Sequence, residues 1–179
     1  MDFLGIALTE IAGISERRIY RLTDGKLNED LPSMLVDNHD AAGLNSGMMM
    51  PQYTAASLVL ENRSLASPDS IYSLPTSAAQ EDHNANSMTA ARHTRSIIEN
   101  TWHVLAIELY TAARAVDIHR KDNPNAILGL GTDAAYQTIR NTVAYQPGDA
   151  LWGPEIDLVK RIIKNGRLST HVKNTLSSL

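Results

Sequence analysis

The longest regular pattern in the sequence lies in MTAARHTRSIIENTWHVLAIELYTAARAVD, residues 88 to 117. Its large apolar residues recur in steps of four and three, the heptad spacing of a helix that packs along one seam. The spacing predicts one helix from Met88 to Asp117, with Ser87 as its N-cap. Such a helix would be about 45 Å long, so it needs long partners, and we expect some of them to come from other chains. The predicted seam consists of Ile98, Trp102, Leu105, Leu109, Ala112 and Val116.

Residues 3–23 show a second helical pattern, with apolar side chains three and four residues apart. The pattern predicts a helix with one stripe buried against the rest of the chain, and Asp2 is a candidate cap. This apolar helix begins at the second residue, with nothing before it to pack against. We therefore expect the chain to begin partway through a larger fold. The stripe consists of Leu4, Ala7, Leu8, Ile11, Ile14 and Leu22.

Three shorter helices are indicated by their ends. Proline is tolerated in the first turn of a helix, so Pro51 and Pro154 each mark a helix start. No segment alternates as a strand does, and the sequence therefore predicts an all-α fold, a bundle of long helices. The shorter helices are expected over 49–62, over 132–145 with Thr132 as the cap, and over 153–165, before a fraying tail from Arg167.

The chain has 179 residues, 43% of them hydrophobic, which is enough to bury a core. This length fits one domain or a large piece of one. We divide the chain into a central long-helix region, 1–118, and a C-terminal helical region, 119–179. The central region includes a long loop, 64–87, which we expect to carry the active site.

The composition excludes several classes of function. With 16 basic and 20 acidic residues the formal charge is −4, and no basic cluster is longer than a pair, so a nucleic-acid surface is not indicated. The absence of cysteine excludes disulfides and thiolate chemistry. No apolar run reaches the roughly 20 residues that span a bilayer, and no signal sequence opens the chain. These features predict a soluble, cytoplasmic protein that binds neither nucleic acid nor membrane.

The loop SLASPDSIYSLPTSAAQEDHNANS, residues 64 to 87, has neither helical nor strand spacing. Loops of about two dozen residues in compact proteins are usually functional or disordered. Near its end, Gln80, Glu81, Asp82 and His83 form a cluster able to accept, donate and shuttle protons. The residues alone leave three readings open: a metal site completed by histidines of the next helix, an acid or base in a pocket, and acids that complement the dipole of that helix.

Five blocks of sequence carry a resemblance to a known family. They are ISERRIYRL (14–22), LPSMLV (31–36), GLNSGMMMPQYTAASLVLEN (43–62), LASPDSIYSLPTSAAQEDH (65–83) and VLAIELYTAARAVDI (104–118). Together they resemble the C-terminal part of histidine ammonia-lyase and, more broadly, the aromatic amino acid ammonia-lyase and aminomutase family. The blocks occur in the family's order with family-like gaps, and residues 40–42 look like a small insertion.

The resemblance implies an enzyme that removes ammonia from an amino acid and leaves an α,β-unsaturated acid. The family does this with 4-methylideneimidazol-5-one (MIO), an electrophile formed from an internal Ala-Ser-Gly. This sequence contains no Ala-Ser-Gly. The resemblance therefore implies that MIO is supplied by a complementary N-terminal lyase chain, and that this chain alone is inactive.

By the same resemblance, Glu81 occupies the position of the family's active-site glutamate, and we predict that it is the catalytic residue. Gln80 and Glu81 are predicted to bind substrate, while Asp82 and His83 are predicted to position the loop. A carboxylate can pair with an imidazole or take up a proton from the departing amine, so Glu81 favours histidine as the substrate.

Three functions stay open at this point. The first is half of a split histidine-type lyase that assembles as a tetramer of pairs. The resemblance implies this assembly, because members of the family are tetramers of long helices that share active sites between subunits. The second is half of a 2,3-aminomutase, which returns the ammonia to the neighbouring carbon. The third is a helical oligomerisation module without catalysis.

Overall fold

The computed structural model describes residues 1–37 and 43–177, and it confirms the all-α fold. Across these residues there is no strand, and an isolated β-bridge joins Thr76 to Glu81. The insertion expected at 40–42 lies outside the described residues. The helices are α1 (Asp2–Thr23), α2 (Met49–Leu65), α3 (Ser87–Asp122), α4 (Leu130–Arg140), α5 (Trp152–Lys164) and α6 (Arg167–Ser177).

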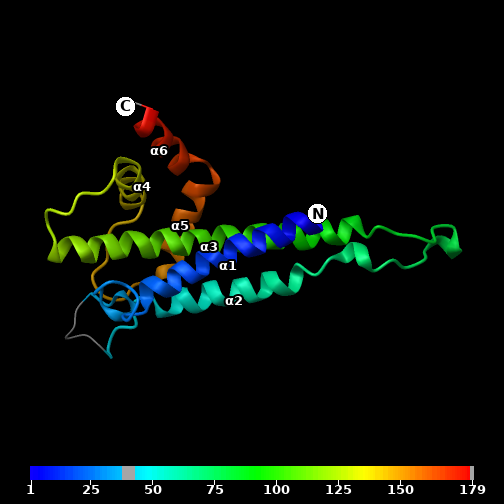
Figure 1. Ribbon diagram of the computed structural model, residues 1–179, viewed down its shortest axis with the longest axis horizontal. Helices are drawn as coiled ribbons and strands as arrows, with labels where there is room; N and C mark the ends of the chain where they lie inside the picture. The colour runs from blue at the N-terminus through cyan, green and yellow to red at the C-terminus, as the bar shows by residue number, and fades with distance from the viewer. Residues whose placement is uncertain (38–42, 178–179) are drawn as a thin grey trace.

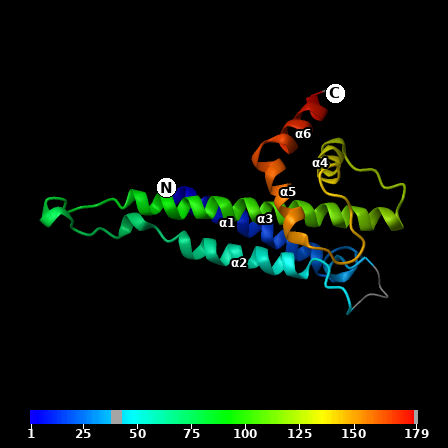
Figure 2. The ribbon, with the colours of Figure 1, turned by 180° about the vertical axis from the view of Figure 1, so that it is seen from behind.

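The three longest helices, α1, α2 and α3, lie side by side in an elongated bundle (Figures 1 and 2). The helix predicted over 88–117 is confirmed as α3, which continues to Asp122. Its N-cap is Asn86, in the left-handed conformation, so the prediction of Ser87 was wrong by one residue. The division into regions 1–118 and 119–179 stays a prediction.

The face of α3 that is buried within this chain lies one residue away from the predicted heptad seam. All six seam residues are only partly buried. The row beside them is buried and is rich in small side chains, which allows α1 to approach closely. The seam itself therefore stays at the surface of the bundle. The buried row includes Ile97, Thr101, Val104, Thr111 and Ala115.

The burial predicted for α1 was wrong, although the helix itself is confirmed. Leu4 and Ile11 are each 47% exposed, and Ile14 is 56% exposed. The side facing the bundle instead carries small and polar residues, and a Cβ on Gly5 would lie 3.2 Å from Ile97 Cδ1. Helical spacing identifies an apolar face but does not show which neighbour covers it. The buried residues of α1 are Gly5, Thr9, Ala12, Ser15, Glu16, Ile19 and Thr23.

Polar contacts hold α1 against α3 along this interior face. The Ser15 hydroxyl donates to Glu108 Oε2 at 2.6 Å, and Arg18 also donates to the Glu108 carboxylate. Because a buried polar group that loses its partner is costly, these bonds favour one register of the two helices. Asp2 was predicted as the cap of α1, but it lies within the helix and does not cap it. Its carboxylate accepts hydrogen bonds from Ser70 instead.

The last three helices lie together on one side of the bundle (Figures 1 and 2). α5 packs on α3 through Tyr110, whose ring meets that of Trp152 edge-on at 6.0 Å between centroids. α4 begins at Leu130, so Thr132 does not cap it. The predicted fraying of the tail was also wrong, because α6 packs on α4, where Leu176 lies over Gly131.

A buried arginine of α3 ties two loops together at the end of the bundle where α1 ends. Arg114 is 1% exposed and donates to the backbone oxygens of Leu35, Gln146 and Gly148. Its guanidinium also lies over the ring of Trp152, 5.1 Å from the centroid. Five donors in a planar fork suit arginine to such a site. We call this region the Arg114 junction.

None of the helices in the described part of the chain is long and apolar enough to cross a membrane.

Candidate active site

Residues 66–86, between α2 and α3, form an arm that extends beyond the end of the bundle (Figures 1 and 2). The loop predicted over 64–87 is confirmed for residues 66–86, which contain two short 3₁₀ turns, Asp69–Ile71 and Ser77–Ala79, whereas Ser64 and Leu65 belong to α2 and Ser87 begins α3. The arm holds no buried residue, and Leu74 is 68% exposed. The arm therefore depends on hydrogen bonds for its shape, because it has no core of its own.

The base of the arm is fixed to the N-terminal parts of α1 and α3. His93 Nδ1 of α3 lies 2.9 Å from Asp69 Oδ2, and the Asp2 carboxylate accepts from both the amide and the hydroxyl of Ser70. The side-chain amide of Asn86 donates to the backbone oxygens of Asp69 and Tyr72. These contacts join the two ends of the arm before it leaves the bundle.

Two further links cross the arm towards its tip. The Asn84 amide donates to the Ser73 hydroxyl at 2.8 Å. Beyond it, Thr76 and Glu81 exchange backbone hydrogen bonds of 2.9 and 3.3 Å. The Thr76 hydroxyl also donates to Glu81 Oε2 at 2.9 Å. The last link therefore binds the carboxylate of the predicted catalytic residue directly.

The turn enclosed by that link is left-handed. Ser77, Ala78 and Ala79 have φ values of 52°, 53° and 65°. Residues with a Cβ avoid this region, at a cost of roughly 1–2 kcal/mol each. Strained backbone of this kind often lies at functional sites, where the surrounding structure maintains it. Here it lies immediately before Gln80 and Glu81.

The four predicted site residues lie together at the arm tip. Gln80, Glu81, Asp82 and His83 are all exposed, and none of them lines the best-formed cavities among residues 1–37 and 43–177. Glu81 is bound by Thr76, whereas no hydrogen bond or ion pair to the side chains of Asp82 and His83 is present among the described residues. The arrangement can present an acid to another molecule, but it does not enclose a substrate.

The histidines of α3 do not join this cluster. His93 pairs with Asp69 at the base of the arm. His103 is partly buried beside α5, where burial and the nearby Lys160 lower its pKa. Within residues 1–37 and 43–177, no three His, Asp or Glu side chains gather as metal ligands would.

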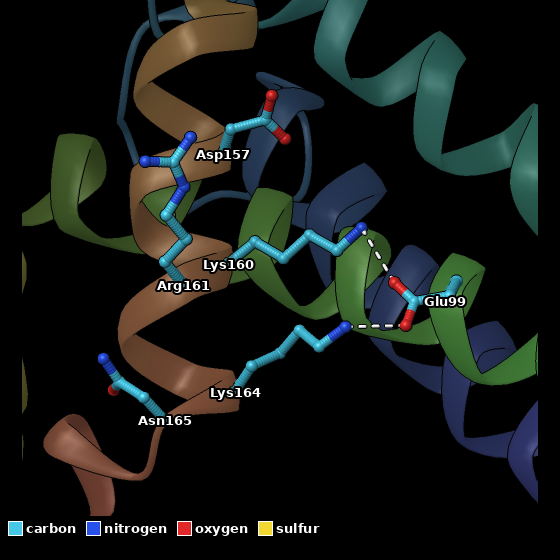
Figure 3. Close-up of a pocket in the computed structure, with 6 residues that line it drawn as sticks. All are labelled: Glu99, Asp157, Lys160, Arg161, Lys164 and Asn165. Carbon is cyan, nitrogen blue, oxygen red and sulfur yellow. Dashed lines mark hydrogen bonds and ion pairs between the residues drawn. The ribbon is translucent and has the colours of Figure 1, made fainter.

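The groove shown in Figure 3 lies between α3 and α5 and has a volume of about 700 Å³. Two lysines of α5 converge there on one carboxylate of α3: Lys164 lies 2.6 Å and Lys160 lies 3.4 Å from Glu99. The hydrogen bond from Lys164 is the main reason that the pKa of Glu99 is lowered. These lysines are engaged in attaching α5 to α3, and the groove contains none of the predicted site residues.

A mainly apolar cavity of about 530 Å³ lies between α1 and α3, towards the end of the bundle opposite the arm. Two residues of the predicted heptad seam, Ala112 and Val116, line it. The seam therefore borders uncovered apolar space.

Sequence reasoning missed the residues that shape the arm. Ser73, Thr76 and Asn86 were read only as polar loop residues, while Asp69 and His93 lie far apart in sequence. In the structure, Ser73 pairs with Asn84 and Thr76 with Glu81, the register of two antiparallel segments, but no residue pattern in the sequence indicates these pairings.

The model of the aromatic amino acid lyase family matches residues 1–141, and the chain belongs to that family.

The similar proteins include histidine ammonia-lyases and aminomutases. Histidine ammonia-lyase 2 of Fusobacterium nucleatum is 44% identical over 179 residues, which is 100% of this chain and 34% of the relative. The structure of histidine ammonia-lyase from Trypanosoma cruzi has a TM-score of 0.88 and 35% identity, covering 97% of this chain and 33% of that one. Tyrosine aminomutase from Streptomyces globisporus has a TM-score of 0.89 and 32% identity, with coverage of 98% and 32%.

The chain is therefore histidine ammonia-lyase-like and has the fold of the C-terminal third of these enzymes. It spans about a third of the length of the relatives that it matches.

Proposed function

We propose that this chain is the C-terminal part of a histidine-type ammonia-lyase and that it acts together with a second chain. The observation that supports this most is the 44% identity to a histidine ammonia-lyase along all 179 residues. In this proposal Glu81 is the catalytic carboxylate, Gln80 helps to bind the substrate, and Asp82 and His83 position the loop. The reaction removes ammonia from the amino acid and leaves an α,β-unsaturated acid.

The MIO group does not fit within this chain. The sequence has no Ala-Ser-Gly from which to form it, and Glu81 is exposed on an arm that holds no buried residue. When supplied by a complementary N-terminal chain, MIO would act as the electrophile that activates the substrate amine. This chain's own contribution is limited to a carboxylate placed at the tip of the arm.

The surface of the bundle supports the need for partner chains. Leu4, Ile11 and Ile14 form an exposed apolar row on α1, and the seam of α3 is only partly buried. Large contiguous apolar surfaces on soluble proteins often mark interfaces. We infer that further long helices cover these faces in a tetramer of pairs, the assembly that the resemblance implies, and the heptad spacing of the seam is consistent with such packing.

The first experiment is native mass spectrometry of the protein purified from its own source. A stoichiometric second chain, lighter than its sequence by two water molecules, is the expected result, because cyclisation of Ala-Ser-Gly to MIO releases two waters. A homo-oligomer of this chain alone would contradict the proposal and would favour the helical module without catalysis.

The second experiment measures histidine turnover by the assembled complex. We expect Glu81→Gln to lower kcat by at least about 100-fold, the usual loss when a group that moves a proton is removed. Asp122→Asn is the matched control, because it neutralises an exposed carboxylate at the opposite end of α3, away from the arm. Equal effects of the two substitutions would contradict a specific role for Glu81.

A 2,3-aminomutase half is the second candidate. It is favoured by the structural similarity to tyrosine aminomutase, with a TM-score of 0.89. Product analysis of the same reaction distinguishes the two functions: a mutase yields a β-amino acid, whereas a lyase yields the free unsaturated acid and ammonia. We further propose a cytoplasmic location for the complex, which fractionation of the source cells would test.

A further inference from the structure

We propose that Thr76 is a positioning residue for Glu81, and that its hydroxyl presets the carboxylate before any substrate arrives. The inference rests on the proposed function, in which Glu81 meets the substrate. It concerns a residue to which neither composition nor motif had assigned a role.

Three hydrogen bonds join the same two residues. Two connect the backbones of Thr76 and Glu81, at 2.9 and 3.3 Å, and the third runs from the Thr76 hydroxyl to Glu81 Oε2 at 2.9 Å. The backbone pair fixes where the Glu81 Cα lies. The side-chain bond selects among the rotamers of a long, flexible side chain, which the backbone pair cannot do.

No other group in the described residues performs this task. Both side chains are exposed, so packing does not restrict Glu81. The hydroxyl of Thr76 is the one donor to the Glu81 carboxylate within residues 1–37 and 43–177. It engages Oε2 and leaves Oε1 without a partner there. The geometry thus holds one oxygen and leaves the other available to a substrate group.

The left-handed turn gives this bond its importance. Ser77, Ala78 and Ala79 all have positive φ values, a conformation that residues with a Cβ rarely maintain unaided. The Thr76–Glu81 link closes the turn, and the Ser73–Asn84 link supports it from below. Loss of the Thr76 hydroxyl would therefore mainly free the Glu81 side chain to change rotamer, and it would weaken the turn to a smaller extent.

The first test measures the rotamer of Glu81 in the full chain by NMR, from the three-bond couplings across its Cα–Cβ bond. We expect one rotamer in the wild type, averaging over several in Thr76→Val, and one rotamer again in Thr76→Ser. Valine keeps the branched shape without the hydroxyl, and serine keeps the hydroxyl. Ser67→Ala is the matched control, since it removes a hydroxyl from the same arm that bonds no described residue.

The second test compares kcat and KM in the assembled complex. We expect Thr76→Val to lower kcat by about tenfold with a smaller change in KM, because substrate can still bind while the carboxylate is less often in place. Thr76→Ser should restore kcat to within about twofold of the wild type.

The two tests separate the inference from the proposed function. A single Glu81 rotamer in Thr76→Val would overturn the positioning role, whatever the activity. Averaging in Thr76→Val, together with an assembled complex that does not turn over histidine, would support the positioning of Glu81 and contradict the lyase function. Equal loss of kcat in Thr76→Val and Thr76→Ser would also overturn the inference.

Discussion

Two of the left-handed turns without glycine lie at opposite ends of the bundle, and different contacts hold them. At the Arg114 junction, Met34 and Leu35 have φ values of 55° and 54°, and the side chain of Leu35 is fully buried. On the arm, the Ser77–Ala79 turn has the same backbone conformation but is exposed throughout.

The difference lies in what maintains the strain. The Leu35 oxygen accepts from Arg114 Nε at 2.9 Å, and the Met34 oxygen accepts from the Met48 amide at 2.8 Å, so distant parts of the chain fix the first turn. Bonds within the arm alone fix the second. The junction is thus part of the folded core, whereas the arm tip is a local structure that can respond to a partner.

The largest effect is expected from Arg114→Ala. The substitution leaves three backbone oxygens without their donor and opens a cavity, so we expect the free energy of unfolding to fall by about 3–4 kcal/mol. Urea denaturation followed by circular dichroism, at one protein concentration, measures it. The control Arg161→Ala removes an exposed arginine and should change stability by less than about 0.5 kcal/mol. Similar values for both variants would show that the junction does not depend on Arg114.

Gly47→Ala is expected to have the next largest effect. Gly47 has a φ of +55°, and a Cβ there would lie 2.3 Å from the Met34 oxygen. The clash and the strain together should cost about 2–3 kcal/mol. Gly13→Ala is the matched control, because a Cβ at Gly13 within α1 meets nothing within 4 Å. That variant should be neutral or up to about 1 kcal/mol more stable in the same denaturation experiment.

A smaller, pH-dependent effect is expected from Asp37→Asn near the junction. Burial raises the pKa of Asp37, but the hydrogen bonds from Lys121 and Tyr145 lower it by more, so the net shift is downward. A lowered carboxyl pKa adds stability above the unfolded value of about 3.9, and that stability is lost as the pH falls through the folded value.

We therefore expect Asp37→Asn to cost about 1–2 kcal/mol at pH 7, and the gap from the wild type to close below about pH 4. Denaturation curves between pH 7 and pH 2.5 test this. A gap of constant size over that range would contradict the role assigned to the ionised carboxylate.

The smallest effect on global stability is expected from Ala78→Gly on the arm. Glycine relieves the left-handed strain but makes the unfolded chain more flexible, so the free energy of unfolding should change by less than about 0.5 kcal/mol. Amide hydrogen exchange over residues 74–83 should nevertheless become faster, since the turn is no longer restricted. Ala85→Gly, on the same arm but without positive φ, is the control. Slower exchange in Ala78→Gly would contradict the view that only local bonds maintain the turn of the arm.

The helices could be predicted from the sequence because heptad spacing and proline positions are local signals. The sequence did not show which neighbouring helix packs against each face. The apolar stripe of α1 points outwards because Gly5, Ala12 and Ser15 provide the close approach to α3, and spacing alone favours the large side chains as the core.

The candidate site was located only in part. The position of Glu81 followed from resemblance, and the structure places it at the tip of a loop, where the loop composition had predicted no regular structure. Its bond to Thr76 depends on a turn of positive φ at Ser77, Ala78 and Ala79, residues that seldom adopt that conformation. No sequence pattern of the kind we used indicates such a turn.

The composition of α3 has a mechanical consequence for the arm. Its 36 residues include no proline and no glycine, the usual sites of a kink, so it behaves as a stiff rod about 54 Å long. The arm is attached at one end of this rod and the Arg114 junction lies about 40 Å away along it. A bend of about two degrees over that length would move the tip by more than about 1 Å, which is enough to misalign a reacting group. The straightness of α3 thus contributes to the position of the arm tip.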